Sequence, residues 1–374
     1  MFKKAQVTAL ALASLVSCAT AYADQSVVIG YAGPLTGGGA NAGKDAENGV
    51  QLAIDEANSQ NIKIGGQTVR FSVSVQDDAA DPRQAVLVAQ KLIDAKVAGV
   101  VGHLNSGATI PASKVYSDAG VPQISPSATN PMYTQQGFPT AFRVIGNDGT
   151  VARALVAQMK AEGKIKKVAV IDDATAYGQG LADLAVVELK KAGLEVARRE
   201  KVTDKTVDFK SVLTGVKASH PDAVFYGGID AQAGPLRRQM GELGIKVPLF
   251  GAAIETDTFM SLAGPAAKDT YSAESGQPPS GTERGKQFLK AFEAKYGKVV
   301  LFAPYAYDAT WALINAMKAA NSADPAKYLP ALKKIDFPGA GGQIAFDDHG
   351  DLKRASVTIF KVDGEHFKVF RVVD

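Results

Sequence analysis

Two short loops rich in hydroxyl groups contain the residues best suited to hold a ligand. Residues 102–109 include Ser106, and residues 125–131 include Ser127 and Thr129. Each loop follows a short apolar run that predicts a β-strand, and a helix is expected to begin near Ser106. The free backbone N–H groups of a helix N-terminus, with hydroxyls beside them, can bind a carboxylate. The alternative is that these residues only cap a helix and form turns.

The sequence contains no complete signature of a catalytic site. Residues 38–44 have the spacing of a phosphate-binding loop, but Asp45 stands where Ser or Thr would bind magnesium. An acid there would repel a triphosphate, so we interpret the segment as a turn ahead of a helix. Neither GxGxxG nor the GxSxG nucleophile elbow occurs. We therefore predict that the chain is not an enzyme and needs no cofactor.

The histidines do not form a metal-binding pattern, because none of them has the paired spacing of zinc ligands. They are His103, His220, His349 and His366. His103 directly follows a predicted buried strand. It either lines the ligand cleft or packs in the core, which is the more common outcome. No metal site is predicted.

The segments that would position the two loops alternate between strands and helices. Strands are predicted near residues 27–30, 69–75, 97–102 and 121–125, with helices near 43–58, from 82 onward and near 106–119. A second run follows Arg143, with helices near 148–162, 178–192, 208–219 and 230–243 and strands near 167–171, 194–200, 223–226 and 248–251. The chain ends with helices near 282–296, 305–320 and 325–334 and strands near 356–361 and 367–373. Two such runs predict an α/β fold of two doubly wound, Rossmann-like lobes, in which ligands lie beyond the carboxyl ends of the strands.

Length and composition fit a pair of ordinary globular domains. The chain has 374 residues, of which 46% are hydrophobic and 21% charged, and this length suits two cores better than one. No segment beyond the N-terminal region contains 18 consecutive uncharged apolar residues. The formal net charge is only +3, so no nucleic-acid partner is expected.

The first residues predict a secretory signal peptide, residues 1–23. Lys3 and Lys4 precede an apolar run, and Ala-Tyr-Ala at residues 21–23 supplies small residues at the two cleavage positions. The mature chain would then begin at Asp24 and reach the periplasm. Cys18, the only cysteine, provides a less favoured alternative, in which a lipid on its sulfur tethers the protein to a membrane.

Several segments in order along the chain resemble the leucine/isoleucine/valine-binding proteins. These are type I periplasmic binding proteins that serve branched-chain amino acid ABC importers. The matching segments span nearly all of the predicted mature chain, and they are residues 33–37, 77–82, 102–104, 111–113, 126–129, 177–180, 225–228 and 350–353.

The resemblance implies two lobes joined by three hinge crossovers. Lobe 1 would comprise residues 24–147 and 276–353, and lobe 2 would comprise residues 148–275 and 354–374. Closure of the lobes around a ligand is the expected motion.

The resemblance also implies a set of ligand-binding residues. In the family, a Ser and a Thr that match Ser106 and Thr129 grip the ligand carboxylate, and backbone at the position of Ser127 helps to hold it. A Tyr that matches Tyr177 closes over the ligand from the second lobe. Leu104 and Phe302 match two apolar residues of the family's pocket.

Three positions depart from the family's pattern. An aromatic lid residue matches Ala42, a second pocket aromatic matches Ile229, and the acid that pairs the ligand ammonium matches Ala253. Loss of a buried acid opposite a cation costs several kcal/mol unless another group replaces it. Either Asp230 or Glu255 replaces the acid, or the ligand lacks an ammonium group.

The implied function is that of the periplasmic substrate-binding component of an ABC importer. It would close around a branched-chain or related amino acid and deliver it to an inner-membrane permease. Two alternatives stay open. The ligand is a small aromatic or aliphatic carboxylate without an ammonium, or the protein is a receptor that senses its ligand and has no role in transport. We expect a monomer.

Overall fold

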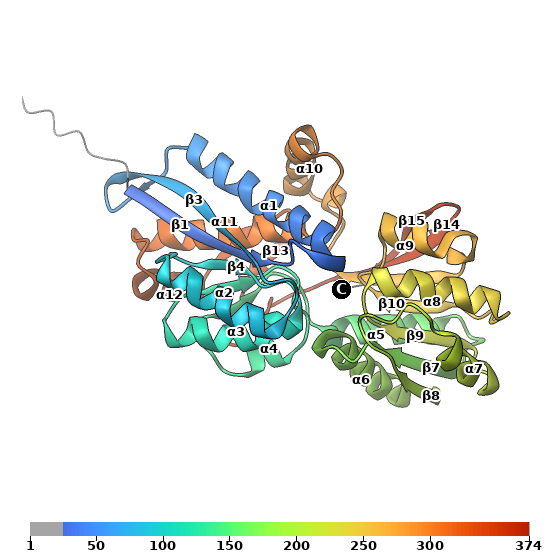
Figure 1. Ribbon diagram of the computed structural model, residues 1–374. Helices are drawn as coiled ribbons and strands as arrows, with labels where there is room; N and C mark the ends of the chain where they lie inside the picture. The colour runs from blue at the N-terminus through green and yellow to red at the C-terminus, as the bar shows by residue number, and fades with distance from the viewer. Residues whose placement is uncertain (1–24, 374) are drawn as a thin grey trace, which may run out of the picture.

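The protein consists of two α/β lobes that lie side by side (Figure 1). The structure is a computed structural model that describes residues 25–373. The predicted signal peptide and Cys18 lie outside the described residues. The two-lobed, doubly wound α/β fold predicted from the sequence is confirmed.

The first lobe is built on a six-stranded sheet in the order β2-β3-β1-β4-β5-β6. All neighbouring strands are parallel except β2, which pairs antiparallel with β3. The strands are β1 (Gln25–Gly33), β2 (Lys63–Ile64), β3 (Gln67–Asp77), β4 (Val100–Gly102), β5 (Gln123–Ser125) and β6 (Ala141–Arg143). The helices of this lobe are α1 (Ala40–Ser59), α2 (Pro82–Asp94), α3 (Ser106–Asp118), α4 (Met132–Gln135), α10 (Glu283–Tyr296), α11 (Ala303–Ala320) and α12 (Pro325–Leu332). A small hairpin, β12 (Asp336–Pro338) with β13 (Gln343–Ala345), stands apart from the sheet.

The second lobe is built on a seven-stranded sheet in the order β15-β14-β11-β10-β9-β7-β8. Its strands are β7 (Lys167–Asp172), β8 (Glu195–Lys201), β9 (Ala223–Gly227), β10 (Leu249–Ala252), β11 (Thr270–Ser275), β14 (Val357–Asp363) and β15 (His366–Val373). The last two strands run antiparallel to their neighbours and close one edge of a parallel sheet. The helices are α5 (Asp148–Ala161), α6 (Ala176–Lys191), α7 (Lys210–Ala218), α8 (Asp230–Glu242) and α9 (Asp257–Ala263).

Local sequence signals explain where several elements begin and end. Asp81 accepts hydrogen bonds from the backbone N–H groups of Arg83 and Gln84, and Pro82 occupies the first turn of α2, as predicted. The alternation of apolar and polar residues along β3 buries Val69 and Phe71 in the core.

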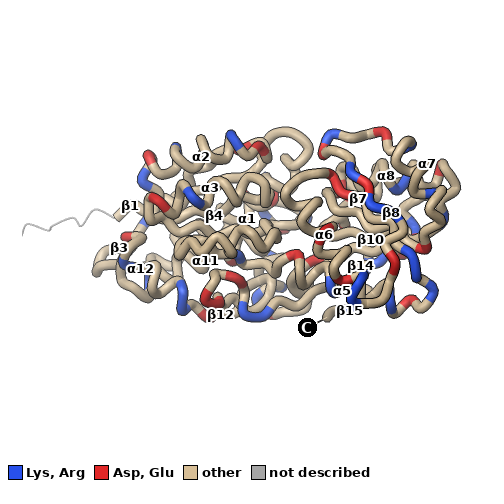
Figure 2. Tube along the Cα trace, turned by 90° about the horizontal axis from the view of Figure 1, so that it is seen from below, with Lys and Arg blue, Asp and Glu red and all other residues tan. Residues whose placement is uncertain are grey.

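Helices cover both faces of each large sheet, and the central strands β4, β5, β9 and β10 are accordingly buried along their whole length. In the first lobe, α1 and α11 cover one face, and α2 and α3 cover the other. In the second lobe, α5 and α6 cover one face, and α7, α8 and α9 cover the other. Lys and Arg are interspersed with Asp and Glu along both lobes when the molecule is seen from below (Figure 2).

The chain passes between the lobes three times. The passages follow β6, follow β11 and precede β14. No strand of either large sheet runs across the predicted lobe bounds at residues 147, 275 and 353. The bounds themselves stay a prediction.

Candidate functional site

A cavity of about 150 Å³ lies between the two lobes, beyond the carboxyl ends of their strands. An apolar cavity of about this size in another protein holds one benzene molecule, so the space suits a small organic ligand. Eight of the nine residues predicted to bind the ligand line it, and they are Leu104, Ser106, Ser127, Thr129, Tyr177, Ile229, Asp230 and Phe302. Ala42 and Ala253 line it as well, whereas Glu255 does not.

The two hydroxyl loops meet at one end of the cavity because β4 and β5 are neighbours in the sheet. Helix α3 begins at Ser106, and no side chain caps its N-terminus. The Ser106 hydroxyl accepts a bond from Asn130 N at 3.3 Å, which leaves its own proton free to be donated. The buried Thr129 hydroxyl lies near the Asp148 carboxyl but has no partner at good hydrogen-bond geometry. Backbone N–H groups and two hydroxyls are therefore available for an anionic group.

Ser127 contributes less directly than its two neighbours. Its hydroxyl already donates to Leu104 O at 2.7 Å. Its backbone N–H reaches only a long contact of 3.4 Å with the Ser125 hydroxyl. The N–H group, rather than the hydroxyl, is the part of Ser127 that a ligand can engage.

Asp148 is a cavity residue that sequence reasoning missed. It is the first residue of α5 and is fully buried, and its backbone N–H donates to Thr129 O at 2.9 Å. Burial raises the pKa of its carboxyl to about 7, although the nearby Thr129 hydroxyl and Arg143 guanidinium oppose the rise. At mildly acidic pH this group is therefore neutral and can donate a proton toward a ligand. The available signal was an acid at the start of a helix directly after a predicted crossover.

The second lobe contributes Tyr177 and Asp230 from two helix N-termini. The Tyr177 hydroxyl donates to Ala252 O at 3.1 Å, which fixes the ring at the cavity wall. Asp230 accepts a bond of 2.6 Å from the Thr256 hydroxyl. Burial raises the pKa of Asp230, and the Thr256 bond opposes that shift.

Glu274 lines the cavity, although the sequence did not predict it, whereas the predicted Glu255 does not line it. Glu255 lies behind the wall and accepts a hydrogen bond from the Ser272 hydroxyl. Glu274 lines the cavity, and its Oε1 atom is buried without a partner. Burial and then the adjacent Glu255 raise the pKa of Glu274 well above its usual value. An acid that ends a strand directly before a crossover was the available signal.

Asp45 holds the segment around Phe302 in place. The carboxylate is buried and accepts backbone N–H bonds from Val300, Leu301 and Ala303 at 2.8 to 3.0 Å. The prediction of a turn over residues 38–44 was wrong for residues 40–44, because a short 3-10 turn covers only residues 37–39 and α1 begins directly after it. Asp45 therefore connects α1 to the segment that places Phe302 against the ligand space.

His103 packs in the core and does not line the cavity. Its Nδ1 lies 2.6 Å from the Asp78 carboxylate, and its Nε2 lies 3.1 Å from the Tyr116 hydroxyl. Among residues 25–373, no group of His, Cys, Asp and Glu has the arrangement of a metal site. No helix of that same part of the chain is long and apolar enough to cross a membrane.

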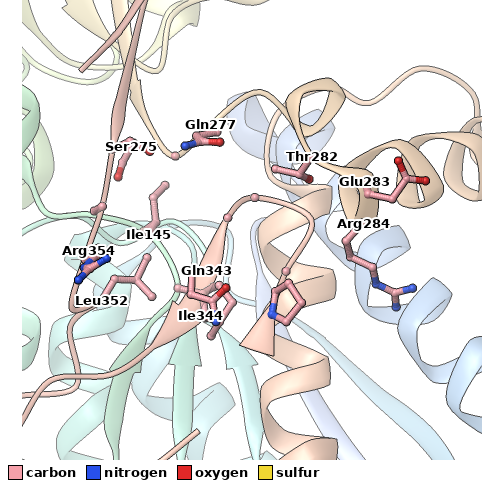
Figure 3. A pocket seen from close by; sticks show the side chains of 18 of the residues that line it. Ile145, Ser275, Gln277, Thr282, Glu283, Arg284, Gln343, Ile344, Leu352 and Arg354 are labelled. Carbon is pink, nitrogen blue, oxygen red and sulfur yellow. The ribbon is translucent and has the colours of Figure 1, made fainter. Parts of the chain in front are cut away.

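A larger hollow of about 870 Å³ lies against the three crossovers (Figure 3). Arg284 and Arg354 stand on opposite sides of it. Arg284 already bonds to Glu56 and to the Tyr307 hydroxyl, and Arg354 is exposed to solvent. None of the nine predicted site residues lines this hollow, so the smaller cavity is the candidate ligand site.

Comparison with known proteins agrees with this geometry. A family model for periplasmic binding proteins matches residues 26–366. The chain belongs to the periplasmic binding protein family. Within it, the protein is a type I member of the leucine/isoleucine/valine-binding group, as the sequence resemblance predicted.

Three relatives of this periplasmic binding protein illustrate the similarity. The Leu/Ile/Val-binding protein homolog 1 of Brucella suis biovar 1 is 35% identical over 365 residues, which are 96% of each chain. A branched-chain amino acid transporter substrate-binding protein from Streptococcus pneumoniae, solved with isoleucine, is 27% identical with a TM-score of 0.82, and the match covers 93% of this chain and 99% of that one. An ABC transporter solute-binding protein from Rhodopseudomonas palustris BisB5, solved with 3,4-dihydroxybenzoic acid, is 25% identical with a TM-score of 0.81, and the match covers 93% and 97%.

Proposed function

We propose that this protein is the periplasmic substrate-binding component of an ABC importer, and that its ligand is a branched-chain or related amino acid. The observation that carries the proposal is the cavity between the lobes. Unpartnered donors of the first lobe, at Ser106 and Thr129, lie on one wall, and Tyr177 of the second lobe lies on the other. The Brucella and Streptococcus relatives support the ligand class.

Binding in such a cavity drives closure because the ligand contacts both lobes. It therefore has higher affinity for the closed arrangement than for the open one. Micromolar affinity corresponds to only about −8 kcal/mol. A few charge-assisted hydrogen bonds to the carboxylate, with modest apolar contact to Leu104 and Phe302, are sufficient for that.

The remaining parts of the proposal concern the protein's setting. The chain is exported by the signal peptide of residues 1–23, acts in the periplasm as a monomer without a catalytic role, and docks on an inner-membrane permease. A lipid on Cys18 stays the less favoured form of export.

The experiment that tests the function is calorimetry of the mature chain with a panel of amino acids and small carboxylates. Substituting Ser106→Ala together with Thr129→Ala should weaken binding at least a hundredfold, because both hydroxyl donors to the carboxylate are lost. The melting temperature without ligand should stay close to that of the wild type. Thr214→Ala, which removes an exposed hydroxyl of α7, is the matched control. Unchanged affinity in the double variant would refute the carboxylate site.

A second ligand class is favoured by one specific observation. The residue at the family's ammonium-pairing position is Ala253, and the Rhodopseudomonas relative binds a benzoic acid derivative, which has no ammonium. A small aromatic or aliphatic carboxylate is therefore the alternative ligand, and the same panel distinguishes it from amino acids.

A further inference from the structure

The charged side chains that line the cavity are all acidic among the described residues. None of the described residues that line the cavity is Lys, Arg or His, whereas three of them are acids, Asp148, Asp230 and Glu274. A zwitterionic or cationic ligand would meet favourable charge there, and a simple anion would not. Asp148 lies beside Thr129 at the carboxylate end, and Asp230 is satisfied by Thr256. Asp148 and Glu274 each have one buried carboxyl oxygen without a partner, and of these two acids Glu274 is the one on β11, next to position 253.

The register between β10 and β11 places Glu274 next to Ala253, the position where the family has its ammonium-pairing acid. β10 and β11 are parallel neighbours in which Ala252 is paired with Ala273. Ala253 and Glu274 are the next residues along these strands, and Ala253 N donates to Ala273 O at 3.1 Å. Residue 274 therefore lies on the strand adjacent to position 253, and both residues line the same cavity.

Glu255 supports Glu274 from behind. The Ser272 hydroxyl donates to Glu255 Oε2, while Oε1 of Glu255 and Oε1 of Glu274 are both buried without a partner. Burial and then the adjacent Glu255 raise the pKa of Glu274 well above its usual value, so Glu274 retains its proton while the cavity holds no cation.

We propose that Glu274, supported by Glu255, receives the ammonium group of an α-amino acid, and that Glu274 releases its proton to water when the ammonium binds. This inference rests on the proposed function and narrows it to ligands that carry both a carboxylate and an ammonium. In the family the acid that pairs the ammonium matches Ala253, in the loop after β10, whereas in this protein the acid stands at the end of β11. The site therefore keeps an acid for the ligand ammonium. Aromatic and aliphatic carboxylates without an ammonium are poor ligands, because they leave the pair without a counter-charge.

Other titratable groups around Glu274 set the background of its pH response. Asp45 of α1 and Tyr305 of α11 face it together with Glu255. Asp148 of α5, Tyr177 of α6 and Asp230 of α8 line the same cavity. Lys361 of β14 and Glu162 lie at the opposite end of β11, around Tyr271. Asp148 releases or takes up protons over its own range in the wild type and in Glu274 variants alike, so the difference between the two proteins isolates the acid pair.

The test measures affinity and proton release for matched ligands. L-leucine is compared with isocaproate and L-phenylalanine with hydrocinnamate, because each second compound is the first without its ammonium. Titration calorimetry at pH 6 in two buffers of different ionisation enthalpy gives the protons released. The wild type should bind the preferred amino acid at least a hundredfold more tightly than its deaminated analogue, with about one more proton released than Glu274→Gln.

In Glu274→Gln the preference for the ammonium should fall to within about tenfold, because the neutral amide removes the counter-charge. Glu255→Gln tests the same pair from its other member and serves as the second variant if Glu274→Gln does not fold. Glu365→Gln, an exposed substitution in the turn between β14 and β15, is the matched control and should match the wild type.

Two results would overturn the inference. One of them rejects only the ammonium site, and the other rejects the proposed function as well. Equal affinity for the amino acid and its deaminated analogue, or unchanged selectivity in both variants, rejects the ammonium site and leaves a solute-binding function standing. No binding of any amino acid or carboxylate to the wild type rejects the proposed function together with it.

Discussion

At the scale of single residues, the cavity combines hydroxyl groups that can donate hydrogen bonds with buried carboxyl groups. Ser106 and Thr129 offer hydroxyl protons, and Asp148 beside them is buried deeply enough to stay neutral at mildly acidic pH. A neutral carboxyl next to a ligand carboxylate adds a donor, whereas an ionised one repels it. The protonation of Asp148 therefore affects both ligand affinity and the stability of the unliganded fold.

Asp148→Asn should make the protein more stable at alkaline pH. The pKa of Asp148 rises from 3.8 to about 7 on folding, so its stabilising contribution is complete below pH 4 and is lost as the pH rises through 7. The isosteric amide cannot ionise. Urea unfolding should show nearly equal stability of the two proteins near pH 4 and an advantage of the variant that grows to about 4 kcal/mol at most by pH 8. A constant difference across this range would contradict the assignment.

At the scale of elements, one carboxylate couples two segments that are far apart in the chain. Asp45 in α1 accepts three backbone bonds from the segment that leads into α11, and the bond to Ala303 joins residues 258 positions apart. Because Phe302 lies within that segment and lines the cavity, the element contact determines part of the ligand space.

Asp45→Ala should lower both stability and ligand affinity. Three buried backbone donors lose their acceptor, which should destabilise the fold by about 3 kcal/mol. Phe302 should also lose its fixed position, with a weaker fit to apolar ligand side chains. Thermal unfolding and calorimetry measure the two effects.

Asp45→Asn retains one acceptor oxygen, so its stability should lie between those of the wild type and Asp45→Ala. Asp118→Ala breaks only the exposed ion pair with Lys114 and should change stability by less than about 1 kcal/mol. Normal affinity and stability in Asp45→Ala would exclude the positioning role.

At the scale of the whole molecule, the lobes meet directly at the mouth of the cleft. The side-chain amide of Asn130 in the first lobe donates to Ala176 O in the second at 2.6 Å. Lys298 and Asp257 add an exposed ion pair of 3.1 Å between the lobes, which is worth little in water. The Asn130 side chain does not line the cavity, and only its backbone N–H contacts Ser106, so we expect the side chain to influence binding through closure.

Asn130→Asp should weaken ligand binding without touching the ligand. The carboxylate keeps the acceptor used by Met132 N but opposes the Ala176 carbonyl, so the closed state loses a bond and gains repulsion. We expect affinity to fall by about fivefold or more, and small-angle scattering to require more ligand for compaction. Asn61→Asp, in an exposed turn, is the control. Identical closure curves for Asn130→Asp and the wild type would show that the contact between the lobes has no role.

The sequence alone predicted the α/β fold and the two-lobed order of elements, and it placed Ser106, Ser127 and Thr129 at strand ends. The other five predicted residues around the cavity came from the family resemblance. Periodicity and turn residues are local signals, and residues at strand ends gather wherever a parallel sheet places those ends. Only the tertiary structure decided that Glu274 adjoins position 253, that Asp45 holds the segment around Phe302, and that His103 pairs with Asp78. These contacts depend on strand register and on crossovers that bring remote segments together, and no local pattern in the chain encodes either.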